Sequence, residues 1–250
     1  MDALRRRAFH LILGLLLLLI LGEGYVWSRA PDGYLHLWIR AAGDGFIART
    51  PAGHLILVDG PGDVAAAEMW LALHLPPTRR TLDALILTRG DRATALAREA
   101  VARRYPPHRA WAPAHPPSSP EMIAWEDAVP AALPLRQGLT LDVAGLLLEV
   151  GNPDPPLLHL RFGRLHVVYA PQPPSADRAL SWAQATLGIA RRLPDPGVPL
   201  PRYLLLPGAA VSPGRGEHLL RADVTLLVPP DSARELHIVT DGVRWYWTWE

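Results

Sequence analysis

Short apolar runs separated by turn-forming residues constrain the fold of this chain more than any other feature. Three such runs follow one another at residues 35–39, 46–50 and 54–58. Runs of this length, bounded by Gly, Pro and Asp, predict β-strands. Helix-like stretches at residues 64–75 and 95–104 lie between later runs. Many strands interleaved with a few helices predict a layered α/β fold.

The rest of the chain continues this pattern. We expect further strands at residues 82–88, one or two within 139–150, and at 157–162, 165–169, 203–206, 224–228, 236–240 and 243–249. Residues 176–192 are predicted to form a helix, and the proline-rich residues 106–120 a surface loop. The Asp241-Gly242 pair between the last two runs is a strong signal for a β-hairpin.

Composition limits the chemistry that the chain can carry. Of its 250 residues, 49% are hydrophobic, which supports a real core and argues against wholesale disorder. All 25 basic residues are arginine, so lysine chemistry is excluded. Cysteine is absent, which excludes disulfides, thiolate metal ligands and cysteine nucleophiles. A net charge of +1 gives no global signal for nucleic-acid binding.

The start of the chain predicts a membrane anchor. Three arginines at residues 5–7 precede an apolar run at residues 8–21, and Tyr25 and Trp27 follow where the far membrane interface would be. A helix over residues 8–27 would rise about 30 Å, which is enough to cross the hydrocarbon core of a bilayer.

The same segment predicts where the domain lies. The positive-inside rule places an arginine-rich tip in the cytoplasm, so residues 1–29 form tip and anchor and residues 30–250 form an extracytoplasmic domain at the cell membrane. A cleaved signal peptide is the alternative. We favour the anchor because Pro31 follows the small-residue site at residues 28–30 and disfavours cleavage there.

Four short motifs follow one another in a recognisable order. They read Gly-Asp at residues 43–44, Thr-Pro-Ala-Gly at 50–53, Leu-Val-Asp-Gly-Pro at 57–61 and Leu-Asp-Ala-Leu-Ile-Leu-Thr at 82–88. This order resembles the metallo-β-lactamase superfamily, and more narrowly the C-terminal extracytoplasmic domain of ComEC-type DNA-uptake (competence) proteins. The resemblance implies an αββα sandwich of two mixed sheets, here preceded by one transmembrane helix, and a zinc-dependent hydrolase site after residue 88.

The side chains that would hold the metal are missing at that place. Where the family reads His-x-His-x-Asp-His, this chain has Arg89, Asp91, Ala93 and Thr94. An arginine cannot act as a ligand and would repel the cation. A binuclear zinc site needs several imidazoles and carboxylates that converge, with an open position for water.

Two further ligand segments have changed as well. Pro171 stands where the resemblance expects a metal-bridging aspartate, and Gly208 lies where a histidine pair would end a strand. Asp59 matches an aspartate that supports the ligand loop without binding the metal. We therefore expect a degenerate site with no catalytic residue, no metal and no cofactor.

Charged residues crowd the mouth of this former site. Arg89, Asp91 and Arg92 fit either a salt-bridged helix start, with Asp91 at the positive end of the helix, or a remnant that binds anions. We favour the helix start.

The last strand carries a second feature of interest. Trp245, Trp247 and Trp249 alternate along it, which places all three on one face. The alternatives are packing, which we favour, and an exposed edge that docks a protein partner or the membrane interface.

These observations favour a membrane-anchored, catalytically inactive domain that acts as a binding or scaffold module. One alternative is an active phosphodiesterase- or nuclease-like hydrolase with a relocated site, which requires clustered histidines and carboxylates. Another is an arginine-mediated nucleic-acid-binding module linked to DNA uptake, which requires the arginines to gather on one face.

Overall fold

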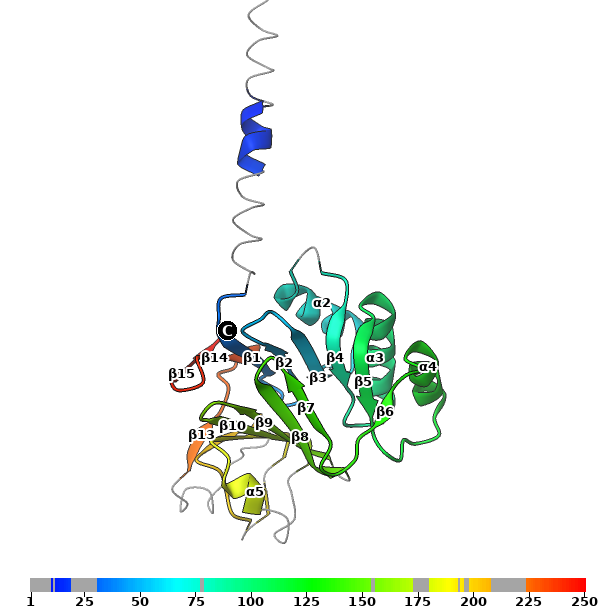
Figure 1. Ribbon diagram of the computed structural model, residues 1–250, viewed down its shortest axis with the longest axis vertical. Coiled ribbons are helices and arrows are strands. Elements are labelled where there is room, and N and C mark those ends of the chain that lie inside the picture. Colours follow the sequence, from blue (N-terminus) through cyan, green and yellow to red (C-terminus); the bar gives the residue numbers. More distant parts are fainter. Residues whose placement is uncertain are drawn as a thin grey trace, which may run out of the picture.

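Two β-sheets packed face to face form the centre of the molecule (Figure 1). The structure is a computed structural model, and it describes residues 10, 12–18, 31–76, 79–153, 156–172, 180–192, 194–195, 198–207 and 224–250. Both sheets contain parallel and antiparallel strands, as the layered α/β prediction requires.

The first sheet has eight strands in the order β15-β14-β1-β2-β3-β4-β5-β6. Their bounds are β1 Leu35–Arg40, β2 Gly45–Arg49, β3 Leu55–Asp59, β4 Leu82–Ile86, β5 Pro107–Ala112, β6 Leu133–Pro134, β14 Glu235–Thr240 and β15 Trp245–Trp249. Strands β3 to β6 run parallel, so the carboxyl ends of these strands lie at one edge of the sheet.

The second sheet has seven strands in the order β13-β12-β11-β10-β9-β8-β7. Their bounds are β7 Thr140–Val143, β8 Leu146–Pro153, β9 Pro156–Phe162, β10 Leu165–Ala170, β11 Leu187–Ala190, β12 Tyr203–Leu205 and β13 Thr225–Leu227. Strands β10 to β13 run parallel, and the others are antiparallel.

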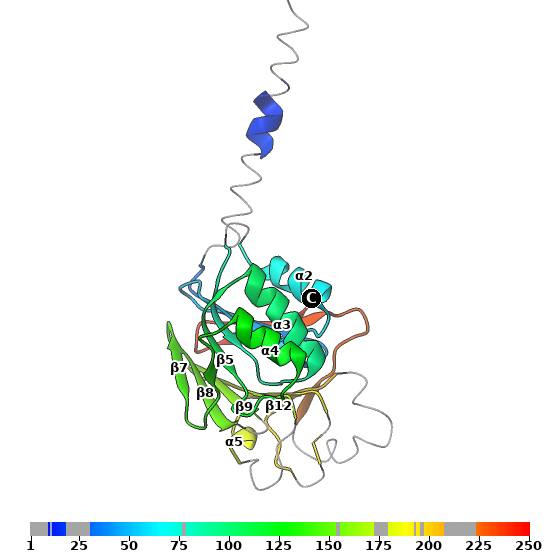
Figure 2. The same ribbon diagram turned by 90° about the vertical axis from the view of Figure 1, so that its right-hand side faces the viewer.

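Alternation along the strands sorts side chains into layers. Leu35, Leu37 and Ile39 of β1 face the second sheet and join the core between the two sheets. Helices α2 (Val64–His74), α3 (Arg92–Arg104) and α4 (Pro120–Ala128) pack on the opposite face of the first sheet (Figure 2). On the outer face of the second sheet, α5 (Leu180–Ala183) buries Trp182 against Val168. The order of layers is therefore helix, sheet, sheet, helix.

Two sequence predictions were wrong because tertiary pairing outweighed local composition. In the predicted helix 176–192, the described residues form only the short α5 and then β11, which pairs in parallel with β10 and β12. A Cβ at Gly188 would lie 2.8 Å from the Trp182 ring, so glycine allows this close packing. The predicted loop 106–120 contains β5, which begins at Pro107, a first-strand position where the missing N–H is tolerated.

The C-terminal hairpin forms, but its loop is longer than the Asp-Gly pair alone would give. Thr240 pairs with Trp245, which leaves four residues, 241–244, in the loop. The Asp241 carboxylate accepts hydrogen bonds from the backbone N–H groups of Val243 and Arg244 at 2.8 and 2.7 Å. The Asp241 side chain thus stabilises a turn inside a four-residue loop, in place of the predicted two-residue Asp-Gly connection.

Most of the predicted anchor at residues 8–27 lies outside the described residues. Residues 12–18 are helical. No helix in the described part of the chain is long and apolar enough to span a membrane.

A buried histidine pair in the second sheet makes stability depend on pH. His159 Nδ1 lies 3.0 Å from His166 Nε2, and burial, reinforced by His166, lowers the pKa of His159 to about 4. The unfolded chain then binds more protons than the folded chain between about pH 4 and 6.5. We expect the free energy of unfolding to fall by about 1–2 kcal/mol as the pH drops through this window.

Urea unfolding at a series of pH values measures this loss. His159→Gln should flatten the profile between pH 4 and 6.5, whereas His108→Gln, at an exposed position, should leave it unchanged. An unaltered profile in His159→Gln would show that other groups control the acid sensitivity.

Candidate functional site

A cleft of about 870 Å³ opens beyond the carboxyl end of β4, where the sequence predicts a degenerate metal site. Its walls come from Asp44, Gly62, residues 88–91, Ala93, Thr94, residues 113–115, Pro117, Pro156, Pro171, Gln172, Arg191 and Arg192. The structure thus brings Pro171, which follows β10, to the same site as Arg89, Asp91, Ala93 and Thr94, which lie together at the end of β4 and the start of α3. Gly208 lies outside the described residues.

Asp59 ties the two sheets together beneath this cleft. It ends β3 with a left-handed backbone φ of 46° and is fully buried. Its carboxylate accepts hydrogen bonds from Thr88 N–H at 2.7 Å, from the Thr88 hydroxyl, and from the Tyr169 hydroxyl of β10 at 2.9 Å. Burial raises the pKa of Asp59, although Arg89 and these hydrogen bonds oppose that shift.

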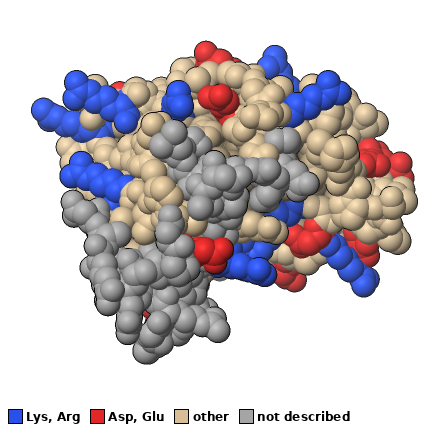
Figure 3. All heavy atoms as spheres, turned by 90° about the horizontal axis from the view of Figure 1, so that it is seen from below, with Lys and Arg blue, Asp and Glu red and all other residues tan. Residues whose placement is uncertain are grey.

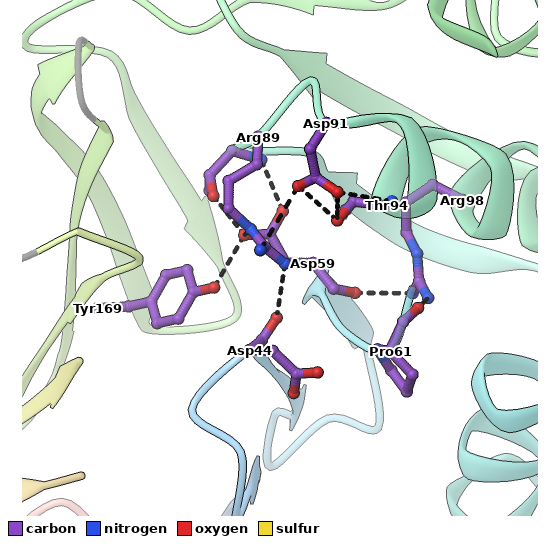
Figure 4. A network of polar contacts seen from close by, with 9 residues as sticks. Asp44, Asp59, Pro61, Arg89, Asp91, Thr94, Arg98 and Tyr169 are labelled. Atoms are coloured by element: carbon purple, nitrogen blue, oxygen red, sulfur yellow. Dashed lines mark hydrogen bonds and ion pairs between the residues drawn. The ribbon is translucent and has the colours of Figure 1, made fainter. Parts of the chain in front are cut away.

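Arg89 lies at the centre of a network of polar contacts (Figure 4). Its Nε lies 3.6 Å from Asp59 Oδ2 and its Nη1 lies 3.5 Å from Asp91 Oδ2. Its Nη2 donates to the backbone carbonyl of Asp44 at 3.4 Å. Burial works to lower the pKa of Arg89, but the neighbouring Asp59 and further anionic groups outweigh it and raise that pKa. The guanidinium is therefore a permanent internal cation.

Asp91 begins helix α3 rather than standing free in the cleft. As the N-cap residue, it accepts hydrogen bonds from the Thr94 backbone N–H at 3.0 Å and from the Thr94 hydroxyl. Arg92 extends outward, with 83% of its side chain exposed, and pairs with Glu121 at 2.7 Å. The interpretation of this segment as a salt-bridged helix start is confirmed.

Sequence reasoning missed Arg98, a second fully buried charged group near the site besides Asp59. Its side chain is fully buried under Asp59, where Nη1 donates to the Asp59 carbonyl at 2.7 Å and Nη2 to the Pro61 carbonyl at 3.0 Å. Burial lowers the pKa of Arg98 to about 10. The available signal was its helical spacing from Thr94 and Val101, which places all three on the buried face of α3.

The residues at this site do not fit a zinc centre. Ala93 has no donor atom, and the side chain of Thr94 is engaged with Asp91. Oxygens of Asp59 and Asp91 already accept hydrogen bonds, and the Arg89 guanidinium lies beside both carboxylates. Among the described residues, no group of three or more His, Cys, Asp or Glu side chains could hold a metal ion.

The tryptophan face of β15 is used mainly for packing. Trp245 meets Tyr203 of the second sheet edge to face, with ring centroids 5.2 Å apart, and Trp249 also packs against the core between the sheets. Trp247, on the outermost strand of the first sheet, remains 43% exposed. The packing interpretation therefore holds for two of the three rings.

No protein-family profile and no curated protein sequence matches this chain. Solved structures do resemble it. The zinc-bound PqqB protein of Methylobacterium extorquens is 14% identical, with a TM-score of 0.40, over 61% of this chain and 55% of its own length. A metallo-β-lactamase of Cronobacter sakazakii, solved as a mutant of its HARLDQ motif, is 13% identical, with a TM-score of 0.41, over 59% of this chain and 72% of its own.

A provisionally assigned metal-dependent hydrolase of Parabacteroides distasonis covers more of the chain. It is 11% identical, with a TM-score of 0.47, over 77% of this chain and 91% of its own. These likenesses concern the fold alone and assign no activity to the chain.

Proposed function

We propose that this chain is a metallo-β-lactamase-like domain that lacks metal chemistry and works as a binding module. The observation that carries the proposal is the Arg89 guanidinium, which lies beside Asp59 and Asp91 where the resemblance expects metal ligands. The order of layers and the two mixed sheets support the comparison with that family.

An arginine replaces the charge of a metal ion but not its chemistry. A guanidinium has no vacant coordination position, so it cannot lower the pKa of a bound water as zinc does. Hydrolysis would then need a nucleophile or base in the cleft. The carboxylates of Asp59 and Asp91 are both engaged in holding Thr88, Tyr169 and Thr94 in place. The cleft therefore keeps a fixed shape and a cation, which suits binding rather than turnover.

The proposed location of the module is the outer face of a membrane. The apolar run at residues 8–21, preceded by arginines and followed by Tyr25 and Trp27, supports a single-pass anchor over residues 8–27 with the N-terminus in the cytoplasm. A ligand or a protein partner would then meet the domain outside the cytoplasm.

The two alternatives have less support. A relocated hydrolase site would need clustered ligands, whereas the part of the chain that the structure describes has no group of three or more His, Cys, Asp or Glu side chains that could hold a metal ion. Two histidine pairs there, His36–His237 and His159–His166, lie within the sheets. A nucleic-acid-binding face would need gathered arginines. On the face shown in Figure 3, basic and acidic side chains are interspersed.

A turnover assay tests the proposal. The purified full chain, incubated with ester, phosphodiester and β-lactam substrates, should show no hydrolysis above background, with or without added zinc. Added chelator should leave its melting temperature unchanged, because no metal stabilises the fold. Zinc-dependent turnover that a chelator abolishes would overturn the proposal.

A further inference from the structure

We infer that the cleft captures its ligand by an anionic group, a phosphate ester or a carboxylate, through Arg191 and Arg192. This inference rests on the proposed metal-independent binding function and names the class of ligand. Three observations carry it: the carboxylates around the cleft already have partners, Arg191 directly follows a strand that is paired on both sides, and the cleft is large enough for a small organic molecule.

The carboxylates that line or underlie the cleft already have partners. Asp44 pairs with Arg40 at 3.3 Å, and Asp91 caps α3 and lies beside Arg89. Asp59 is fully buried and accepts hydrogen bonds from Thr88 and Tyr169. These groups are therefore committed to the structure and do not neutralise the arginines at the mouth.

Arg191 and Arg192 are placed differently. Both line the cleft and both are exposed. Within the described residues, neither has a carboxylate at ion-pair distance. Each guanidinium group carries a fork of N–H donors that matches the oxygens of a phosphate or carboxylate, and these two consecutive arginines line the same cleft. His115, from the loop after β5, and Gln172, just after β10, line the same cleft and add further side chains that can form hydrogen bonds.

A rigid element supports the base of this arginine pair. Arg191 directly follows β11, the strand that pairs in parallel with both β10 and β12. The end of β11 is held against the loop before Asp44, where a Cβ added to Gly43 would lie 3.0 Å from the Ala190 carbonyl oxygen and 3.7 Å from Arg191 Cα. Ordered strand ends of this kind position binding groups more precisely than free loops do.

The walls indicate how the rest of the ligand is accommodated. A volume of about 870 Å³ is far larger than a single phosphate ion and suits a small organic molecule. The described walls are rich in small and rigid residues, with four prolines at positions 113, 117, 156 and 171, and they contain no Phe, Tyr or Trp side chain. Recognition would therefore rely mainly on charge and hydrogen bonds, with the imidazole of His115 as the one aromatic ring of the described walls.

Calorimetric titration of the full chain at low ionic strength tests the inference. The probes are glucose 6-phosphate, citrate and unphosphorylated glucose. We expect glucose 6-phosphate or citrate to bind, glucose not to bind, and added salt to weaken binding because the contacts are exposed charges. The ratio of the two affinities then distinguishes a phosphate ester from a carboxylate as the preferred group.

A pair of variants separates site binding from general attraction. Arg191→Gln/Arg192→Gln should weaken binding at least tenfold. The control, Arg161→Gln/Arg164→Gln, removes the same charge from an exposed β9–β10 hairpin outside the cleft walls and should change binding less than twofold. Equal weakening in both variants, or no binding of either anion, would overturn the inference. Either result would leave the proposed metal-independent function untouched, because that function is tested separately by the turnover assay with and without zinc.

Discussion

Replacing Arg89 with methionine is expected to lower the free energy of unfolding by about 3–5 kcal/mol, since it leaves a buried carboxylate without its counter-ion. Asp59 is fully buried, and Arg89 is the nearest cation that opposes the rise of its pKa. Arg92→Met is the matched control. Because Arg92 is 83% exposed, losing its pair with Glu121 should cost about 1 kcal/mol or less.

A double variant and a pH series show whether the loss comes from the Asp59 charge. In Arg89→Met/Asp59→Asn the buried charge is removed together with its partner, so much of the lost stability should return. Without Arg89 the folded-state pKa of Asp59 rises further. Protonation of Asp59 at lower pH then favours the folded state. The difference in free energy of unfolding between the wild type and Arg89→Met should therefore shrink as the pH falls. A deficit that is independent of both pH and Asp59 would contradict the charge-compensation account.

Replacing Arg98 with methionine is expected to cost about 3 kcal/mol of stability, even though Arg98 forms no ion pair with a described carboxylate. Its two Nη groups satisfy the carbonyls of Asp59 and Pro61, which are held in the turn after β3. Removing the donor leaves buried carbonyl groups unpaired, and each such group costs about 1–3 kcal/mol.

Urea unfolding of three variants isolates this role. Arg98→Lys keeps a cation but cannot reproduce the forked pair of hydrogen bonds, so it should lie between the wild type and Arg98→Met. Arg103→Met, on an exposed part of the same helix, should change stability by less than about 1 kcal/mol. If Arg98→Met were as stable as the wild type, the turn after β3 would not depend on this arginine.

The apolar strands were predictable because burial on both sides leaves continuous apolar runs in the sequence. Strands β3 and β4 are the clearest cases, and both were predicted near their observed bounds. Strand β11 was not predictable, because residues 187–190 become a strand only through pairing with β10 and β12. Strand β5 was not predicted either, because the prolines in residues 106–120 indicated a loop, whereas residues 107–112 form a strand by pairing with β4.

The candidate site was predictable in its position but not in its chemistry. The motif spacing located Asp59 and Arg89 at one place, since Asp59 ends β3, Arg89 comes after β4, and the carboxyl ends of these parallel strands lie at the same edge of the sheet. The contact of Asp59 with Tyr169 depends on how the two sheets pack, which residue spacing does not encode. Arg98 was missed because a lone arginine among charged helix residues normally faces solvent.

Zinc content is the most direct measure of whether Arg89 has replaced the metal centre. The full chain, dialysed against micromolar zinc and then against metal-free buffer, should retain much less than one zinc ion per chain by atomic emission. Its urea unfolding curve should be the same with and without chelator. One or two tightly held zinc ions per chain, with stability that falls when they are removed, would contradict the account.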